Sequence, residues 1–147
     1  DFKYDVKQNR VVFLIKDRDT HKIVGAVGRT LNKNDFPKWF MYGNKDVPFK
    51  CGICDDAVIV EDCPSACAVS NVLTGIAIMG TKLKDTHLNH IKPYKNLYIC
   101  LDRDATAKSY DMANNLRSSG FENVIVKPIE DDLKYYKTDE IRSIFYG

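Results

Sequence analysis

Long apolar runs are missing from this 147-residue sequence, and none approaches the roughly 18 residues that a membrane-spanning helix needs. The first residues are charged and lack both the apolar core of a signal peptide and an initiator methionine. We therefore expect neither a membrane protein nor a secreted one. We also expect the chain to be a processed product or a piece of a longer protein.

The sequence also lacks a strong excess of charge of one sign. Lys and Arg number 22 against 20 Asp and Glu, which leaves a net charge of +2. Because this excess is so small, any nucleic-acid-binding surface must come from a local cluster of basic residues. Hydrophobic residues make up 44% of the chain, which is enough for a core, so the length and composition predict one soluble globular domain.

A regular cysteine pattern is absent as well. Cys51 and Cys54 form one CxxC pair, but a structural zinc site usually needs a second pair of ligands. Cys63 and Cys67 lie four apart in an expected helix, and Cys100 falls in an expected strand. We therefore expect free thiols in a reducing compartment and no structural zinc in this chain. The three histidines have no clustered partners, and all are expected at the surface.

The first fifty residues differ in pattern from the rest of the chain. Two β-like runs, 10–16 and 23–31, flank a short polar turn and predict an antiparallel hairpin. An extended aromatic segment is expected over 37–43. From residue 57 onward strand-like and helix-like segments alternate, which predicts βαβ units and a mainly parallel sheet covered on both faces. Strands are expected at 57–61, 75–79, 96–102 and 123–127, and helices at 64–73, 84–91, 105–118 and 138–145, the last capped by Thr138.

Carboxylates follow two of the expected strands. Glu61 closes one strand, and Asp102 closes another, with Asp104 two residues later. The carboxyl ends of parallel strands meet at one edge, about 5 Å apart for neighbours and about 10 Å apart with one strand between. Carboxylates so placed can share one or two divalent ions, because Mg²⁺ prefers oxygen ligands. The alternative is that they are ordinary polar residues at strand ends.

Several segments resemble motifs of one known family. The segment VIVE at 58–61, followed by PSA at 64–66, resembles the glutamate motif of TOPRIM domains, the metal-binding fold shared by primases, topoisomerases and some nucleases. The segment LDRD at 101–104 looks like the DxD motif of that family, about forty residues later, as the family requires. Between them, 76–81 resembles the segment that follows the first helix in primases.

The likeness extends over roughly residues 10–145. Segments 10–30 and 37–39 are similar to the region before the TOPRIM core in DnaG-type and bacteriophage primases, and 129–134 looks like their late acidic motif. The residue sequence of the glutamate motif is closer to that of phage primases or primase-helicases than to that of bacterial primases. Two departures, Ala107 and the Asp-Cys pair at 62–63, stand where glycine is usual, and neither removes a ligand.

The resemblance implies a fold and a domain division. We expect an α/β chain with a compact, mainly parallel four-stranded TOPRIM sheet flanked by helices and preceded by a small antiparallel β segment. Residues 1–50 would be the tail of a primase-like N-terminal subdomain, and residues 51–147 the TOPRIM catalytic domain. We expect a cytoplasmic protein, in the host cytoplasm if the chain is of phage origin.

The resemblance also implies the residues of the site. Glu61, Asp102 and Asp104 would be catalytic and would hold Mg²⁺ or Mn²⁺, with Asp132 as a further ligand. Whether Glu61 binds a second metal or acts as general base stays open. The expected nucleotide- and nucleic-acid-binding residues are Arg29, Lys38, Lys82 and Lys108, and the alternative for each is solvated surface. Burial against the hairpin is expected for Trp39, Phe40 and Tyr42, with stacking on bases as the alternative.

The favoured function is a primase RNA-polymerase core that synthesises short RNA primers on single-stranded DNA by metal-dependent nucleotidyl transfer. Nucleoside triphosphates, a DNA template, a replicative helicase and a zinc-binding module would be its partners, with no membrane. One alternative is a TOPRIM nuclease, whose acids activate water. Another is a shortened primase-like protein that binds a replication partner without catalysis. Segments 28–29 and 37–38 favour the primase, and the short length of the chain favours the last alternative.

Overall fold

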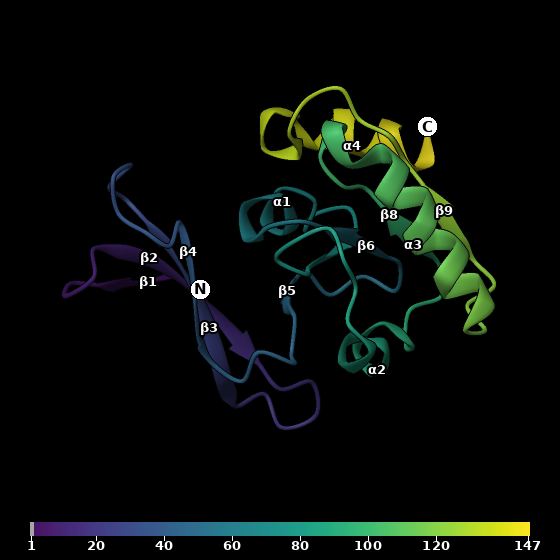
Figure 1. The fold of residues 1–147 in the computed structure, drawn as a ribbon. Coiled ribbons are helices and arrows are strands. Elements are labelled where there is room, and N and C mark those ends of the chain that lie inside the picture. The colour runs from purple at the N-terminus through teal and green to yellow at the C-terminus, as the bar shows by residue number, and fades with distance from the viewer. Residues whose placement is uncertain (1) are drawn as a thin grey trace.

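Two β-sheets lie side by side in this computed structural model, which describes residues 2–147 (Figure 1). The first is an antiparallel sheet in the order β1-β2-β3-β4. Its strands are β1 (Phe2–Asp5), β2 (Arg10–Lys16), β3 (Ile23–Thr30) and β4 (Trp39–Gly43). The expected hairpin is confirmed as β2 and β3, but it is the centre of a larger sheet because β1 and β4 pair along its two edges.

The second sheet has five strands in the order β5-β7-β6-β8-β9. Four of them are parallel and β5 is antiparallel to β7, so the expected mainly parallel sheet is confirmed and the expected strand number, four, is one too low. The strands are β5 (Phe49–Cys51), β6 (Ala57–Val60), β7 (Thr74–Ala77), β8 (Leu97–Ile99) and β9 (Val124–Val126). The additional strand, β5, straddles the domain boundary expected at residue 50.

Four α-helices and three short 3-10 turns connect these strands within the described residues. The helices are α1 (Cys63–Ala68), α2 (Leu88–Ile91), α3 (Thr106–Ser118) and α4 (Thr138–Tyr146), and the turns are η1 (Asp85–His87), η2 (Arg103–Ala105) and η3 (Leu133–Tyr135). Each helix expected from the sequence is present, although α1 is shorter than expected and the first half of the 84–91 segment forms the turn η1. No helix among residues 2–147 is both long and apolar enough to cross a membrane.

The start of α4 differs from the expectation that Thr138 would cap it. Lys137 is the N-cap, and Thr138 is already the first helical residue. The Glu140 carboxylate accepts a hydrogen bond from the Lys137 backbone N–H at 3.0 Å, which satisfies a donor at the helix end. The capping contact therefore comes from the acid in the first turn.

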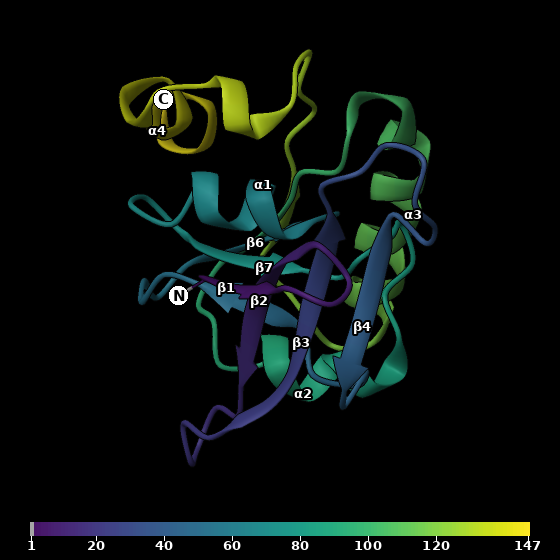
Figure 2. The ribbon, with the colours of Figure 1, turned by 90° about the vertical axis from the view of Figure 1, so that its left-hand side faces the viewer.

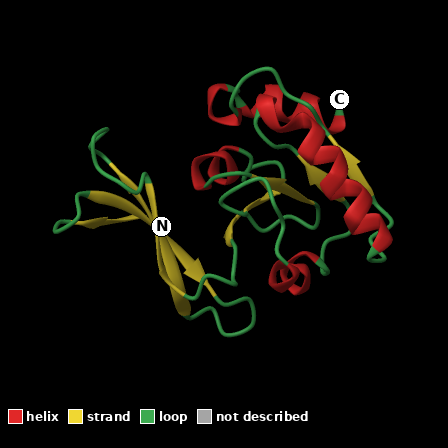
Figure 3. Cartoon of the chain, viewed as in Figure 1, coloured by secondary structure: helices red, strands yellow, loops and turns green. Residues whose placement is uncertain are grey.

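The second sheet is buried on both faces, as its nearly continuous apolar strands predicted. Val58 and Val60 belong to the cluster that contains α1, α4 and part of the antiparallel sheet, whereas Ala57 and Ile59 belong to the cluster under α3. Figure 3 shows helices on either side of this sheet, and Figure 2 shows the antiparallel sheet against it. This packing fixes which strand ends meet at one edge.

The aromatic residues of β4 have different surroundings. Trp39 is half-buried and packs against Phe13 with 6.1 Å between ring centroids, so its expected burial is confirmed. Phe40 is 36% exposed and lies against Tyr42 with 4.9 Å between centroids. The expected burial of Phe40 is therefore wrong. This side chain lies at the surface of β4, outside the core.

Candidate functional site

The carboxylates of Glu61 and Asp102 meet at the edge of the second sheet. Their strands, β6 and β8, are direct neighbours in parallel register, with Ile59 opposite Ile99. Each acid follows its strand within three residues, and the Asp102 backbone N–H donates a hydrogen bond to Glu61 Oε1 at 3.2 Å. This is the closer of the two arrangements that the sequence allowed.

Burial and like charge act on both acids. The pKa of Glu61 is raised to about 7, first by burial and then by the negative charge of Asp102. The pKa of Asp102 is also raised, first by burial and then by the charges of Asp62 and Asp132, with a smaller effect from Asp104. Ionising these groups together is unfavourable without a cation.

The other two expected ligands lie beside this pair on short turns. Asp104 lies in η2, two residues after Asp102, and its side chain is exposed. Asp132 precedes η3, and its Oδ2 lies 3.8 Å from Lys134 Nζ. In the part of the chain that the structure describes, no three acidic, histidine or cysteine side chains are gathered closely enough to form a metal site by themselves. The pair at the centre nevertheless fits Mg²⁺, which usually takes only one or two carboxylates and fills its shell with water and phosphate oxygens.

Asp62 belongs to this acidic group and was not among the expected site residues. It is the N-cap of α1, where its carboxylate accepts a hydrogen bond from the Ser65 backbone N–H at 3.0 Å. The sequence held a signal for this role, because an aspartate two residues before Pro64 is typical of a helix start. That contact directs Asp62 partly toward its own helix.

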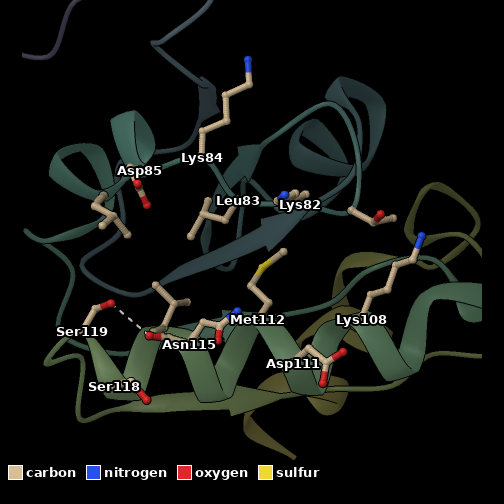
Figure 4. A pocket seen from close by; sticks show the side chains of 13 residues that line it. Lys82, Leu83, Lys84, Asp85, Lys108, Asp111, Met112, Asn115, Ser118 and Ser119 are labelled. Atoms are coloured by element: carbon tan, nitrogen blue, oxygen red, sulfur yellow. Dashed lines mark hydrogen bonds between the residues drawn. The ribbon is translucent and has the colours of Figure 1, made fainter.

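Two of the four expected basic residues, Lys82 and Lys108, line one cavity. It has a volume of about 760 Å³ and lies between the 81–88 segment and α3 (Figure 4). Lys82 and Lys108 lie on opposite walls, and Met112 points from α3 into the space between them. Its apolar and polar lining further includes Leu83, Leu88, Leu116, Asp111, Asn115 and Ser119. The cavity therefore combines lysine and aspartate side chains with apolar ones.

A second cavity of about 270 Å³ joins the two sheets. Val27 and Met41 of the antiparallel sheet face Gly80 and Lys82 of the loop after β7 across it. Lys82 thus lines both cavities. His87 lines this one too and is 3% exposed, so its expected surface position is wrong. Its Nδ1 accepts a hydrogen bond from the Lys84 backbone N–H at 3.3 Å, and burial lowers its pKa to about 4.

Arg29 and Lys38, the other two expected basic residues, lie on the antiparallel sheet. The Arg29 guanidinium lies 5.1 Å from the centroid of the Trp39 ring, and the two residues are register partners. Lys38 is exposed, and the buried Arg10 side chain forms hydrogen bonds with the backbone of its segment. Arg10 donates to the Pro37 carbonyl at 2.7 Å and to the Lys38 carbonyl at 3.4 Å. The structure thus separates the basic candidates into two pairs.

Comparison with known proteins gives a fold-level likeness. No protein-family model matches the chain, and no curated protein matches its sequence. A primase from Aquifex aeolicus, solved with its zinc-binding and RNA polymerase domains, matches with a TM-score of 0.66 and 24% identity over 93% of this chain and 37% of that chain. The primase fragment of the bacteriophage T7 primase-helicase protein gives a TM-score of 0.60 and 13% identity over 91% and 58%.

The RNA polymerase domain of Mycobacterium tuberculosis primase DnaG is similar as well. Its complex with a double-stranded DNA oligomer with a 6-nucleotide overhang matches with a TM-score of 0.68 and 20% identity, over 93% of this chain and 52% of that chain. The chain therefore spans between 37% and 58% of the length of these solved chains. Its α/β fold is similar to the fold of the RNA polymerase domain of DnaG-type primases.

Proposed function

We propose that this chain is the catalytic core of a TOPRIM-type primase, which joins ribonucleotides into short primers on single-stranded DNA by metal-dependent nucleotidyl transfer. The observation that carries the proposal is the contact of Glu61 with Asp102 at neighbouring parallel strand ends, in a fold similar to primase RNA polymerase domains. The late acidic motif supports it too, because the charge of Asp132 acts on Asp102.

Each acid has a role in this proposal. Asp102 and Asp104 would hold Mg²⁺ or Mn²⁺, with Asp132 as a further ligand. The metal would neutralise the triphosphate and the leaving pyrophosphate. Glu61 would either complete the ligand set or accept the proton of the attacking 3′-hydroxyl. In the metal-free chain its pKa is raised to about 7, and a general base works best when its pKa lies near the operating pH.

The basic residues would bind phosphates in two separate places. Lys82 and Lys108 line a cavity of about 760 Å³, a size usual for small-molecule sites, and would bind the triphosphate there. Arg29, which lies over the Trp39 ring, would offer a bidentate contact to a further phosphate. Lys38, exposed nearby, would contact the template backbone.

The proposed partners follow from the same function. Single-stranded DNA would be the template, and a zinc-binding module would select the starting sequence, as the two-domain composition of the Aquifex protein suggests. A replicative helicase is proposed as a further partner, because one similar chain is part of a primase-helicase protein. A bacteriophage origin and the host cytoplasm remain part of this proposal.

Synthesis and degradation assays separate the primase from the nuclease. The chain would be incubated with Mn²⁺, nucleoside triphosphates and a long single-stranded template, and products would be resolved on a gel. We expect weak dinucleotide synthesis that Glu61→Gln abolishes, while Glu61→Gln still binds triphosphate. Degradation of the template, with Glu61 required and Arg29 dispensable, would establish the nuclease instead. Capture of a helicase without binding of triphosphate or metal would establish the partner-binding protein.

A further inference from the structure

Two cysteines from separate elements are brought together beside the second sheet. Cys51 in β5 is the register partner of Gly75 in β7, so their side-chain positions point to the same face of the sheet. A Cβ on Gly75 would lie only 2.5 Å from Cα of Ala66, which places α1 directly over that position. Cys51 therefore points toward α1, and Cys67 is the residue next to Ala66 on that helix.

The two thiols interact with each other. The neighbouring Cys67 thiol lowers the pKa of Cys51 to about 6, against the opposing effect of burial. The same neighbour relation raises the pKa of Cys67. The proximity of Cys67 thus favours the thiolate form of Cys51, and the thiolate is the reactive nucleophile of cysteine chemistry.

Small molecules can reach this pair. Both sulfur-bearing residues line a cavity of about 260 Å³, whose apolar walls include Phe2, Leu14 and Phe49. Cys63 and Cys100 differ in this respect, because both are buried and burial raises the pKa of each thiol. Among these four cysteines, Cys51 is the one that combines access from a cavity with a lowered pKa.

We propose that Cys51 and Cys67 are a modification site, a dithiol that low-molecular-weight disulfides oxidise reversibly to an intramolecular disulfide. The inference does not depend on the proposed nucleotidyl transfer. It replaces the expectation that every thiol stays free, and it joins Cys51 to Cys67 rather than to its CxxC partner Cys54. Disulfides in a reducing compartment are typically transient and redox-sensing.

The chemistry balances with one small-molecule disulfide, RSSR, as oxidant. The Cys51 thiolate attacks one sulfur of RSSR, the S–S bond of RSSR breaks, and RS⁻ leaves. RS⁻ takes the proton of Cys67, and the new Cys67 thiolate attacks the Cys51 sulfur of the mixed disulfide. The second RS⁻ then leaves. The two cysteines lose two electrons and RSSR gains them, yielding one RSH and one RS⁻.

The bond would act on the element that follows Glu61. It would link the edge strand β5 to α1, which begins two residues after Glu61 and carries Asp62 at its N-cap. Closing the loop from 51 to 67 restricts the unfolded chain more than the folded one, in which the two thiols are already adjacent. The oxidised protein should therefore unfold at a temperature several degrees higher than the reduced protein.

The test uses the whole chain and oxidised glutathione at millimolar concentration. We expect two of the five thiols to be lost, a Cys51–Cys67 linked peptide in the digest, and full reversal by dithiothreitol. Cys51→Ser and Cys67→Ser should each abolish the linked peptide, and the matched control Cys54→Ser should retain it. A Cys51–Cys54 link, a lasting glutathione adduct on Cys51, or no thiol loss in the folded wild type would each overturn the proposal.

Discussion

Glu61 and Asp102 present two carboxylates to each other at a half-buried strand edge, where burial already disfavours their charged forms. Asp62, Asp104 and Asp132 add negative charge around them. Such a group of like charges lowers the stability of a metal-free chain. The titration of Glu61 is therefore the residue-scale property that reports most clearly on the site.

We expect the metal-free protein to lose stability as the pH rises from about 4.5 to about 7, the interval between the ordinary and the raised pKa of Glu61. In this interval the folded chain keeps a proton that the unfolded chain has released, so the free energy of unfolding falls with rising pH. Glu61→Gln should remove this component and be more stable than wild type above pH 7, by up to about 1 kcal/mol because solvent screens the pair.

Urea unfolding in a chelator at pH 5 and pH 8 measures this difference. Glu122→Gln is the matched control, since Glu122 is exposed in a loop, and it should keep the slope of the wild type. An unchanged slope in Glu61→Gln would show that Glu61 titrates normally and would remove the electrostatic basis of the site.

At the scale of elements, the packing of α1 on β7 holds the glutamate end of the site. Gly75 allows this contact, because an added Cβ would meet the Ala66 carbonyl oxygen at 2.3 Å. Gly75→Ala should therefore shift α1 and cost about 1–3 kcal/mol of stability, the range for overpacking a close contact. Thermal unfolding of the variant checks this, and a stability equal to wild type would mean that α1 can move away freely.

The antiparallel sheet has a functional role in the proposal through Arg29. Arg29→Ala should weaken the binding of nucleoside triphosphate with Mg²⁺ by roughly 1.5–3 kcal/mol, the range for hydrogen bonds to charged groups. Arg18→Ala is the matched control, because Arg18 is exposed in the β2–β3 turn and forms an ion pair with its neighbour Asp19 at 3.2 Å. Calorimetric titration measures both variants. Equal binding by Arg29→Ala and wild type would transfer the role to Lys82.

At the scale of the whole molecule, the long apolar strands were predictable and the short edge strands were not. Strands β6 to β9 follow from apolar runs between helical segments. Strand β5 has only three residues, and its pairing with β7 joins positions 24 to 28 residues apart, from Cys51 with Gly75 to Phe49 with Ala77, so no local periodicity in the sequence predicts it. The burial of His87 could not be predicted for the same reason, because the antiparallel sheet that helps to enclose it lies far away in the sequence.

The candidate site divides in the same way. Glu61 and Asp102 could be placed at one edge because parallel strand ends must meet there. The effect of Asp62 on the pKa of Asp102 and the position of Lys82 in the lining of two cavities depend on how loops fold back. The local sequence does not specify this folding. The division of the basic residues between the antiparallel sheet and the cavity beside α3 likewise follows from how distant segments pack.

Binding of Mn²⁺ by the purified chain tests the central claim most directly, namely that the carboxylates at this edge form a metal site. The paramagnetic resonance signal of free Mn²⁺ would be followed during titration with protein, alongside the melting temperature. We expect weak binding by the wild type, a melting temperature that rises with Mn²⁺, and loss of both in Asp102→Asn. Asp55→Asn, a matched change at an exposed aspartate, should behave as wild type. Binding and stabilisation that persist unchanged in Asp102→Asn would contradict the account.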